Sequence, residues 1–200
     1  MTHQQFPGAG EAGQALRNNA MTTQSVTDVP TLPDAGTYRV DPQRSSVTYA
    51  CRHMFGLGTV SADFTISSGL LNVSSTLAGS SASATIDAAS FDSANERRDR
   101  DVKGRGLLDV AAFPTIAFSS TGIREDGGAI LLAGIVAMQG VEAAVEVTVL
   151  SWESPAPGQI SVTARAEHLD RYSFGITGAR GFVGRYFDLA FQVVAVRTGR

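Results

Sequence analysis

The stretch Asn95–Phe118, NERRDRDVKGRGLLDVAAFPTIAF, is unlike the rest of the chain. It opens with a dense run of charges of both signs, turns apolar, stops at a proline and continues into a strand-like segment. Asn95 is suited to cap a helix, Glu96 would place a negative charge in its first turn, and Gly104 is suited to end it. We expect one short helical insertion, about residues 95–112, at the rim of a cavity.

On both sides of this insertion, short segments alternate apolar and polar residues with the period of a half-buried strand. The segment 141–152, for example, places Val145 and Val147 on one face and Glu146 on the other. The expected strands are residues 37–40, 45–52, 59–66, 70–73, 81–87, 115–121, 129–137, 141–152, 159–167 and 186–196.

These segments amount to about eight principal strands joined by short turns. Strands that are neighbours in sequence usually pair in space, and an up-and-down sheet of this size tends to close because closure removes its edges. The predicted fold is therefore all-β, an eight-stranded antiparallel up-and-down β-barrel with one helical insertion. A barrel of eight strands has an interior wide enough for its own side chains or for one ligand.

Composition and charge exclude one class of function, nucleic-acid binding. The chain has 200 residues and a net charge of −3, which suits one domain without a basic field for nucleic acid. Its only arginine-rich run, residues 97–105, is interrupted by acidic residues, so no nucleic-acid partner is expected. The single cysteine, Cys51, cannot form an internal disulfide and lies on the expected inner face of its strand.

The first part of the chain differs from the rest. Residues 1–35 are rich in Gly, Ala, Gln and Thr without periodicity, which predicts a disordered leader before a single domain at residues 36–197. The leader has no apolar core of the kind found in signal peptides, and no window is long and apolar enough to span a membrane as a helix. On this pattern we expect a cytoplasmic protein.

Several short motifs of the chain resemble those of one protein family. The matching segments are Tyr38–Pro42, Ser45–Val47, Arg52–Met54, Ile86–Ser90, Asn95 with Arg98 and Asp99, Leu108–Val110 and Phe113–Phe118. Together they resemble the YceI-like family of lipid-binding proteins, over essentially the whole expected domain.

The resemblance implies a lipocalin-like barrel with a long isoprenoid chain, either a polyprenyl compound or the tail of an isoprenoid quinone, in an apolar tunnel. It also implies a bacterial, non-enzymatic carrier that needs no cofactor besides the bound lipid, contacts a membrane transiently and can pair as a homodimer. The chain departs from the family at Ser173–Gly175, where an Asp-Phe-Gly-like element is usual. This change bears on the lipid head group more than on the fold.

Large apolar residues are the candidates for the tunnel wall, since an isoprenoid chain needs a dry apolar tube. The candidates are Phe55, Phe64, Phe91, Leu108, Phe113, Ile116, Phe118, Trp152, Phe174 and Phe191. The alternative is that most of these side chains fill a solid core.

Candidates for contacts with a lipid head group are His53, at a strand end, and Arg98 and Asp99 in the charged segment. The alternatives are a structural histidine and a solvated helix with ion pairs such as Asp99–Lys103. No metal site is expected, because the histidines are far apart in sequence.

Three other functions remain open at this stage. The barrel could bind another amphiphile, such as a fatty acid or fatty amide. It could be an enzyme that uses polar residues at the barrel mouth, for instance His53 with Asp99, although the chain has no nucleophile elbow or dinucleotide fingerprint. It could also be a structural protein with a filled core.

Overall fold

The structure, a computed structural model, describes residues 32–53 and 58–199. Most of the expected leader, residues 1–35, lies outside the described residues. Phe55 also lies outside them. Among the described residues, no helix combines the length and the apolar composition needed to cross a membrane.

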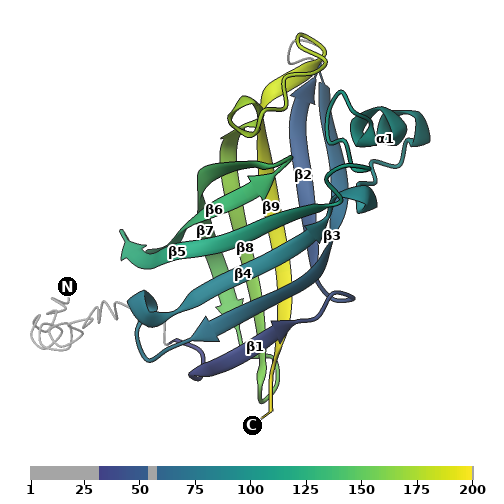
Figure 1. The fold of residues 1–200 in the computed structure, drawn as a ribbon. Coiled ribbons are helices and arrows are strands. Elements are labelled where there is room, and N and C mark those ends of the chain that lie inside the picture. Colours follow the sequence, from purple (N-terminus) through teal and green to yellow (C-terminus); the bar gives the residue numbers. More distant parts are fainter. Residues whose placement is uncertain (1–31, 54–57, 200) are drawn as a thin grey trace, which may run out of the picture. The chain divides into compact units, whose positions relative to one another are not determined.

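Within the described residues, nine antiparallel strands form one sheet that closes on itself (Figure 1). The strands are β1 (Gly36–Val40), β2 (Ser46–His53), β3 (Gly58–Val73), β4 (Ser81–Asp87), β5 (Thr115–Asp126), β6 (Ala129–Met138), β7 (Val141–Glu153), β8 (Gln159–Asp170) and β9 (Val183–Arg197). The helical elements of the described part are α1 (Glu96–Lys103) and the short 3₁₀ helices η2 (Leu77–Gly79), η3 (Ala88–Ser90) and η4 (Arg171–Phe174).

The order of the strands confirms the predicted barrel. From β3 onward each strand pairs with the next in sequence, and β9 pairs with β2 and thereby closes the ring. β1 and β2 share one position in this ring, because both lie between β3 and β9, at opposite ends of those strands. The closed barrel therefore has eight positions, as expected for an antiparallel up-and-down barrel.

The prediction of two separate strands at 59–66 and 70–73 is wrong, because β3 continues through Ser67–Gly69. The pairing of β3 with β4 shifts register between Ile66 and Ser68, so this segment forms a bulge instead of a turn. A Cβ at Gly69 would lie 2.7 Å from Cγ2 of Val40. The glycine therefore permits close approach of neighbouring strands.

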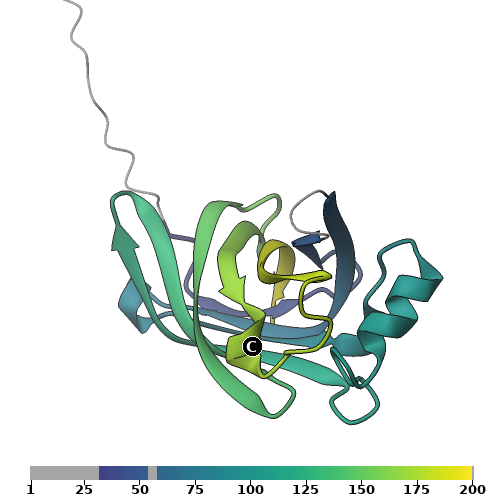
Figure 2. The same ribbon diagram turned by 90° about the horizontal axis from the view of Figure 1, so that it is seen from above.

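The helical insertion is present but shorter than expected. The side chain of Asn95 caps α1 by accepting a hydrogen bond from the backbone of Arg98 at 3.0 Å, and Gly104 ends the helix. Residues 104–112 form successive turns, in which Leu108 donates to the carbonyl of Val102 at 2.9 Å. Seen from above, α1 lies outside the ring of strands (Figure 2).

The seam between the neighbouring strands β7 and β8 is paired along only part of its length. Within the described sheet, residues 148–153 of β7 pair with β8, whereas residues 141–147 pair only with β6. The facing residues 166–170 of β8 pair only with β9. Gly175, directly after η4, lies close to the side chain of Val141. A Cβ added at Gly175 would lie 3.5 Å from Cγ2 of Val141. The seam is therefore closed there by the η4 segment and not by strand pairing.

Candidate functional site

The inward faces of the strands surround a cavity of about 470 Å³. Every strand contributes to its wall, for example through Val40, Val47, Phe64, Ile86, Ile116, Met138, Val145, Val162 and Phe187 in the order β1 to β9. This volume falls in the range of small-molecule sites. The barrel interior is therefore not filled throughout by its own side chains.

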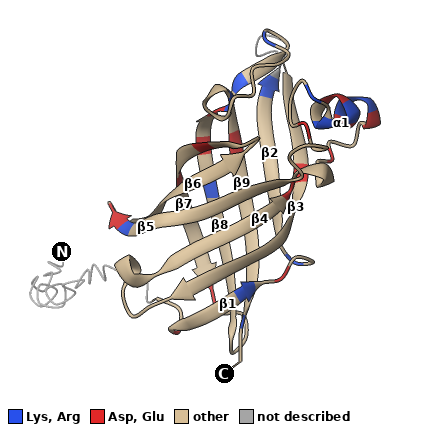
Figure 3. Cartoon of the chain, in the orientation of Figure 1, with Lys and Arg blue, Asp and Glu red and all other residues tan. Residues whose placement is uncertain are grey.

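The wall of the cavity is almost entirely hydrocarbon. Among the described residues, its charged side chains are Arg98, Asp101 and Arg171, and Ser83 and Tyr49 contribute hydroxyl groups. Charged residues are dense on α1, and others lie on loops, at hairpin ends and within strands (Figure 3). An apolar cavity holds water poorly, so this space suits a hydrocarbon chain.

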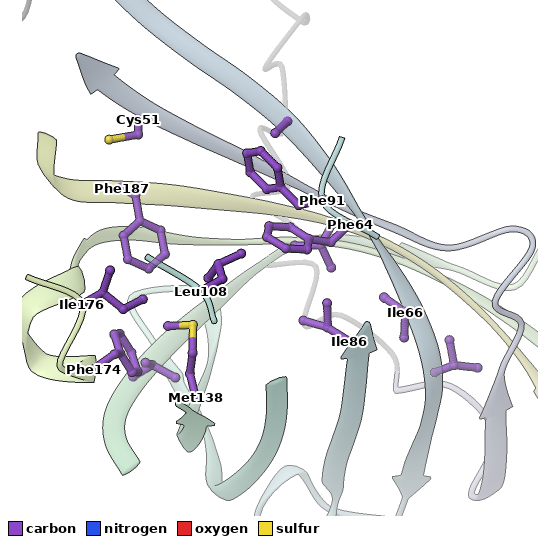
Figure 4. Packing of buried hydrophobic residues seen from close by; sticks show 14 of the residues in the cluster. Cys51, Phe64, Ile66, Ile86, Phe91, Leu108, Met138, Phe174, Ile176 and Phe187 are labelled. Atoms are coloured by element: carbon purple, nitrogen blue, oxygen red, sulfur yellow. The ribbon is translucent and has the colours of Figure 1, made fainter. Parts of the chain in front are cut away.

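Aromatic rings on the cavity wall form a connected row, of which Figure 4 shows those of Phe64, Phe91, Phe174 and Phe187. The rings of Phe64 and Phe91 meet edge to face with centroids 5.2 Å apart, and Tyr49 lies 6.1 Å from Phe91. Phe187 continues the row, 5.4 Å from Tyr49 and 6.4 Å from Phe174. Such contacts fix the positions of the rings, which gives the wall a defined shape.

The end of the barrel at β1, which is the lower end in Figure 1, is closed by packed side chains. Tyr38 is 2% exposed there, and Ile160 and Ala195 are also buried. The hydroxyl of Tyr38 donates a hydrogen bond to the carbonyl of Asp34 at 2.7 Å, which satisfies the polar end of this side chain. Val40 lies in the same cluster and forms part of the cavity wall.

Two loops meet over the upper end. The backbone at Gly178 lies directly against the carbonyl of Gly106, and the side-chain amide of Gln139 donates a hydrogen bond to the carbonyl of Leu107. Leu108 is buried beneath these contacts. The charged insertion thus contributes a cap through its apolar second half, residues 104–112.

Most of the predicted wall residues do lie on the cavity. They are Phe64, Phe91, Leu108, Ile116, Phe118, Phe174 and Phe191. Phe113 does not line it: this side chain is 37% exposed and its ring approaches Gly140 on the β6–β7 turn. Trp152 does not line it either, since it lies beyond the register shift of β7 between Val149 and Ser151.

The predicted head-group residues Arg98 and Asp99 both bind Ser93. Arg98 donates from Nε to the Ser93 hydroxyl at 2.7 Å, and Asp99 accepts from the same hydroxyl at 2.5 Å and from the Ser93 amide at 3.0 Å. These bonds to Ser93 lower the pKa of the Asp99 carboxyl below its ordinary value.

Asp99 does not line the cavity, and no Asp99–Lys103 ion pair is present among the described side chains. Arg98 lies on the cavity wall, but its guanidinium donates hydrogen bonds to the hydroxyl and the carbonyl of Ser93. The side chain of His53 lies outside the described part of the structure, so its expected role stays a prediction.

Sequence reasoning missed Arg171, which is 3% exposed and lines the cavity. Its guanidinium donates to the carbonyls of Gly184 at 2.9 Å, Ile176 at 2.6 Å and Val183 at 3.2 Å. It also missed Tyr49 and Phe187. Tyr49 and Phe187 each lie in a segment where apolar and polar residues alternate, so the sequence does indicate that they face inward. No local pattern in the sequence distinguishes Arg171.

The described residues do not meet the requirements of a metal site. Within residues 32–53 and 58–199, no three His, Cys, Asp or Glu side chains are placed to hold a metal ion. Cys51 is buried on the wall, where its thiol lies 3.2 Å from the carbonyl of Arg52. It is a small core residue, as its place in the alternation predicts.

The sequence profile of the YceI-like domain matches residues 38–195, from within β1 to within β9. The chain belongs to the YceI-like family. No curated protein matches the sequence.

Several solved structures share the fold of this chain. BcnA of Burkholderia cenocepacia is 23% identical with a TM-score of 0.69, over 78% of this chain and 99% of that one. A polyisoprenoid binding domain from Saccharophagus degradans, implicated in plant cell wall breakdown, is 11% identical with a TM-score of 0.58, over 80% and 98%. A YceI protein of Campylobacter jejuni is 14% identical with a TM-score of 0.51, over 60% and 73%.

Proposed function

We propose that this protein binds an isoprenoid lipid, a polyprenyl compound or an isoprenoid quinone, inside its barrel as a carrier or store and not as an enzyme. The observation that carries the proposal is the apolar cavity of about 470 Å³, which is closed below by Tyr38 and capped above at Gly106 and Gly178. Membership of a binding-protein family supports it, as does the polyisoprenoid binding described for the Saccharophagus domain.

The energetics favour a long chain. Each buried CH₂ group contributes roughly 0.8 kcal/mol, so a prenyl unit contributes about 3–4 kcal/mol before ordering costs. Binding loses part of this through the immobilisation of both partners. A tail of several prenyl units therefore binds firmly with few polar contacts, which is what this wall provides.

Native mass spectrometry with lipid extraction tests the proposal. The purified protein is expected to carry an isoprenoid, or to take one up from added prenyl quinone or polyprenol at one molecule per chain. The same extraction identifies a fatty acid or fatty amide if the ligand is another amphiphile. Protein that carries no lipid and takes up no prenyl compound would overturn the proposal.

A matched pair of variants locates the bound lipid. Ala84 of β4 lines the cavity, whereas Ala117 of the neighbouring strand β5 is exposed on the outer face. Ala84→Trp fills part of the cavity and is expected to abolish or strongly reduce uptake, while Ala117→Trp leaves uptake intact. Equal uptake by both variants would place the lipid outside the barrel.

A further inference from the structure

Arg171 is a buried cation in an apolar cavity, and such a charge is costly unless it is compensated. Its partners are the three backbone carbonyls of Ile176, Val183 and Gly184, which are neutral. The three hydrogen bonds to these carbonyls use only part of the N–H donors of the guanidinium. None of the ion pairs among the described residues includes Arg171.

The acidic residues near Arg171 do not neutralise it. Asp170 precedes it, but the Asp170 carboxylate is held by Arg185, with Nη2 at 2.6 Å and Nε at 3.0 Å, and accepts from the backbone of Tyr172 at 3.0 Å. This pairing, more than the weaker influence of Arg171, lowers the pKa of Asp170. Asp101 lines the cavity, but no contact joins it to Arg171 among the described residues.

Further positive charge surrounds the same point. The guanidinium groups of Arg171, Arg180 and Arg185 lie 4.8, 5.2 and 5.1 Å from the centre of the Tyr172 ring. Asp170 balances one of these three cations. Arg180 and Arg185 are exposed to solvent, so the buried positive charge on the cavity wall at this end is that of Arg171, which favours an anion.

A second donor faces the same space. Tyr49 lies on the cavity wall in β2, two residues before Cys51. Burial, with a smaller contribution from the Cys51 thiol, raises the pKa of the Tyr49 hydroxyl, and the charge of Arg171 opposes this rise. The hydroxyl therefore keeps its proton and can donate a hydrogen bond into the cavity that Arg171 also lines.

We propose that Arg171 and Tyr49 form a site for an anionic oxygen head group at the upper end of the cavity. The hydrocarbon tail then runs down the barrel toward Tyr38. This inference rests on the proposed function and moves the head group from Arg98, which is committed to Ser93, to the end of β8. A singly charged group such as a carboxylate matches one guanidinium better than a phosphate dianion, which would leave a buried excess of negative charge.

Matched ligands with one tail test the inference by calorimetry: geranylgeraniol, geranylgeranoic acid and geranylgeranyl monophosphate. We expect the acid to bind at least about tenfold more tightly than the alcohol, because charge-assisted hydrogen bonds are the stronger ones. The monophosphate is expected between them. A monophosphate that binds most tightly would support an anionic site and identify phosphate as its head group.

Variants assign the preference to these residues. Arg171→Gln and Tyr49→Phe are expected to reduce the ratio of acid to alcohol affinity, whereas Arg124→Gln, which removes an exposed charge paired with Glu146, leaves it unchanged. Equal affinity of acid and alcohol in the wild-type protein would overturn the inference and leave the proposed function intact. Failure of all three ligands to bind would overturn both.

A measurement on the wild-type protein covers the case in which Arg171→Gln does not fold. Carbon-13 NMR of bound geranylgeranoic acid, labelled at the carboxyl carbon, gives the ionisation of the head group during a pH titration. Beside Arg171 the pKa of this carboxyl is expected to fall below its value in water. A raised pKa would mean that the head group lies in an apolar environment, and would contradict the proposed site.

Discussion

The α-carbon of Gly178 lies against the carbonyl oxygen of Gly106: a Cβ at position 178 would come within 1.7 Å of that oxygen. The two glycines belong to the two loops that cap the barrel, the first after η4 and the second after α1. The two loops can therefore touch at this point only because Gly178 has no side chain. A Cβ at Gly106, in contrast, would meet nothing within 4 Å.

Gly178→Ala is expected to separate the two loops and to lower stability by about 1–3 kcal/mol, as overpacking does elsewhere. It should also speed the release of bound lipid, because the cap no longer closes. Gly106→Ala is the matched control and should change stability by less than about 0.5 kcal/mol. Thermal unfolding and stopped-flow release of a fluorescent prenyl analogue measure both effects, and identical behaviour of the two variants would contradict the role of the contact.

Gly134 shapes the cavity wall in a similar way. A Cβ at this position of β6 would lie 2.3 Å from the ring of Phe118, which lines the cavity from β5. Gly134→Ala should force the ring to move, which costs about 1–3 kcal/mol and weakens lipid binding. Gly122, where a Cβ would meet nothing within 4 Å, provides the control. Wild-type affinity and stability in Gly134→Ala would show that the wall adapts more easily than its packing indicates.

Asp99 links the position of α1 to pH. Its hydrogen bonds from Ser93 lower the pKa of the carboxyl below 3.8, so the folded state favours the ionised form. The contribution of Asp99 to the stability of the folded state is complete above the ordinary pKa of the carboxyl. It is lost as the pH falls through the lowered pKa. Below that pH the amide resonance of Ser93 should shift in NMR spectra.

Two variants control this titration. Asp99→Asn should remove the low-pH transition of the Ser93 amide, whereas Asp101→Asn removes a charge from the same helix and should leave the transition in place. A Ser93 amide that titrates in the same way in Asp99→Asn would show that another group is responsible.

The seam between β7 and β8 predicts a local difference in hydrogen exchange. Residues 141–147 and 166–170 lack partners across this seam, whereas β2 and β3 pair without interruption from Ser46 to His53. Amides at the seam should exchange faster than those of β2, and bound lipid should slow them. Equal protection of both regions would mean that η4 closes the seam as firmly as strand pairing would.

The alternation of side chains was enough to predict the barrel. Inward-facing residues such as Val47 and Phe64 keep the strand period, and the helix cap at Asn95 follows from local chemistry. The break expected at Ser67–Gly69 was wrong, since glycine there serves close packing and not a turn. Local sequence does not distinguish these two uses of glycine.

The candidate site was less accessible from sequence. Aromatic residues within strands could be assigned to the wall by their period, but Phe113 and Trp152 lie where a loop or a register shift ends that period. Arg171 becomes conspicuous only once the fold buries it and brings Val183 and Gly184 to it. Charge density in the sequence pointed instead to α1, where Arg98 and Asp99 hold Ser93.

Whether lipid tails occupy the barrel interior can be measured by calorimetric binding of geraniol, farnesol and geranylgeraniol. These alcohols share one head group and differ by one prenyl unit. We expect affinity to rise by at least about tenfold with each unit until the cavity is full, since each adds buried hydrocarbon. Affinities that do not change with tail length would contradict this expectation.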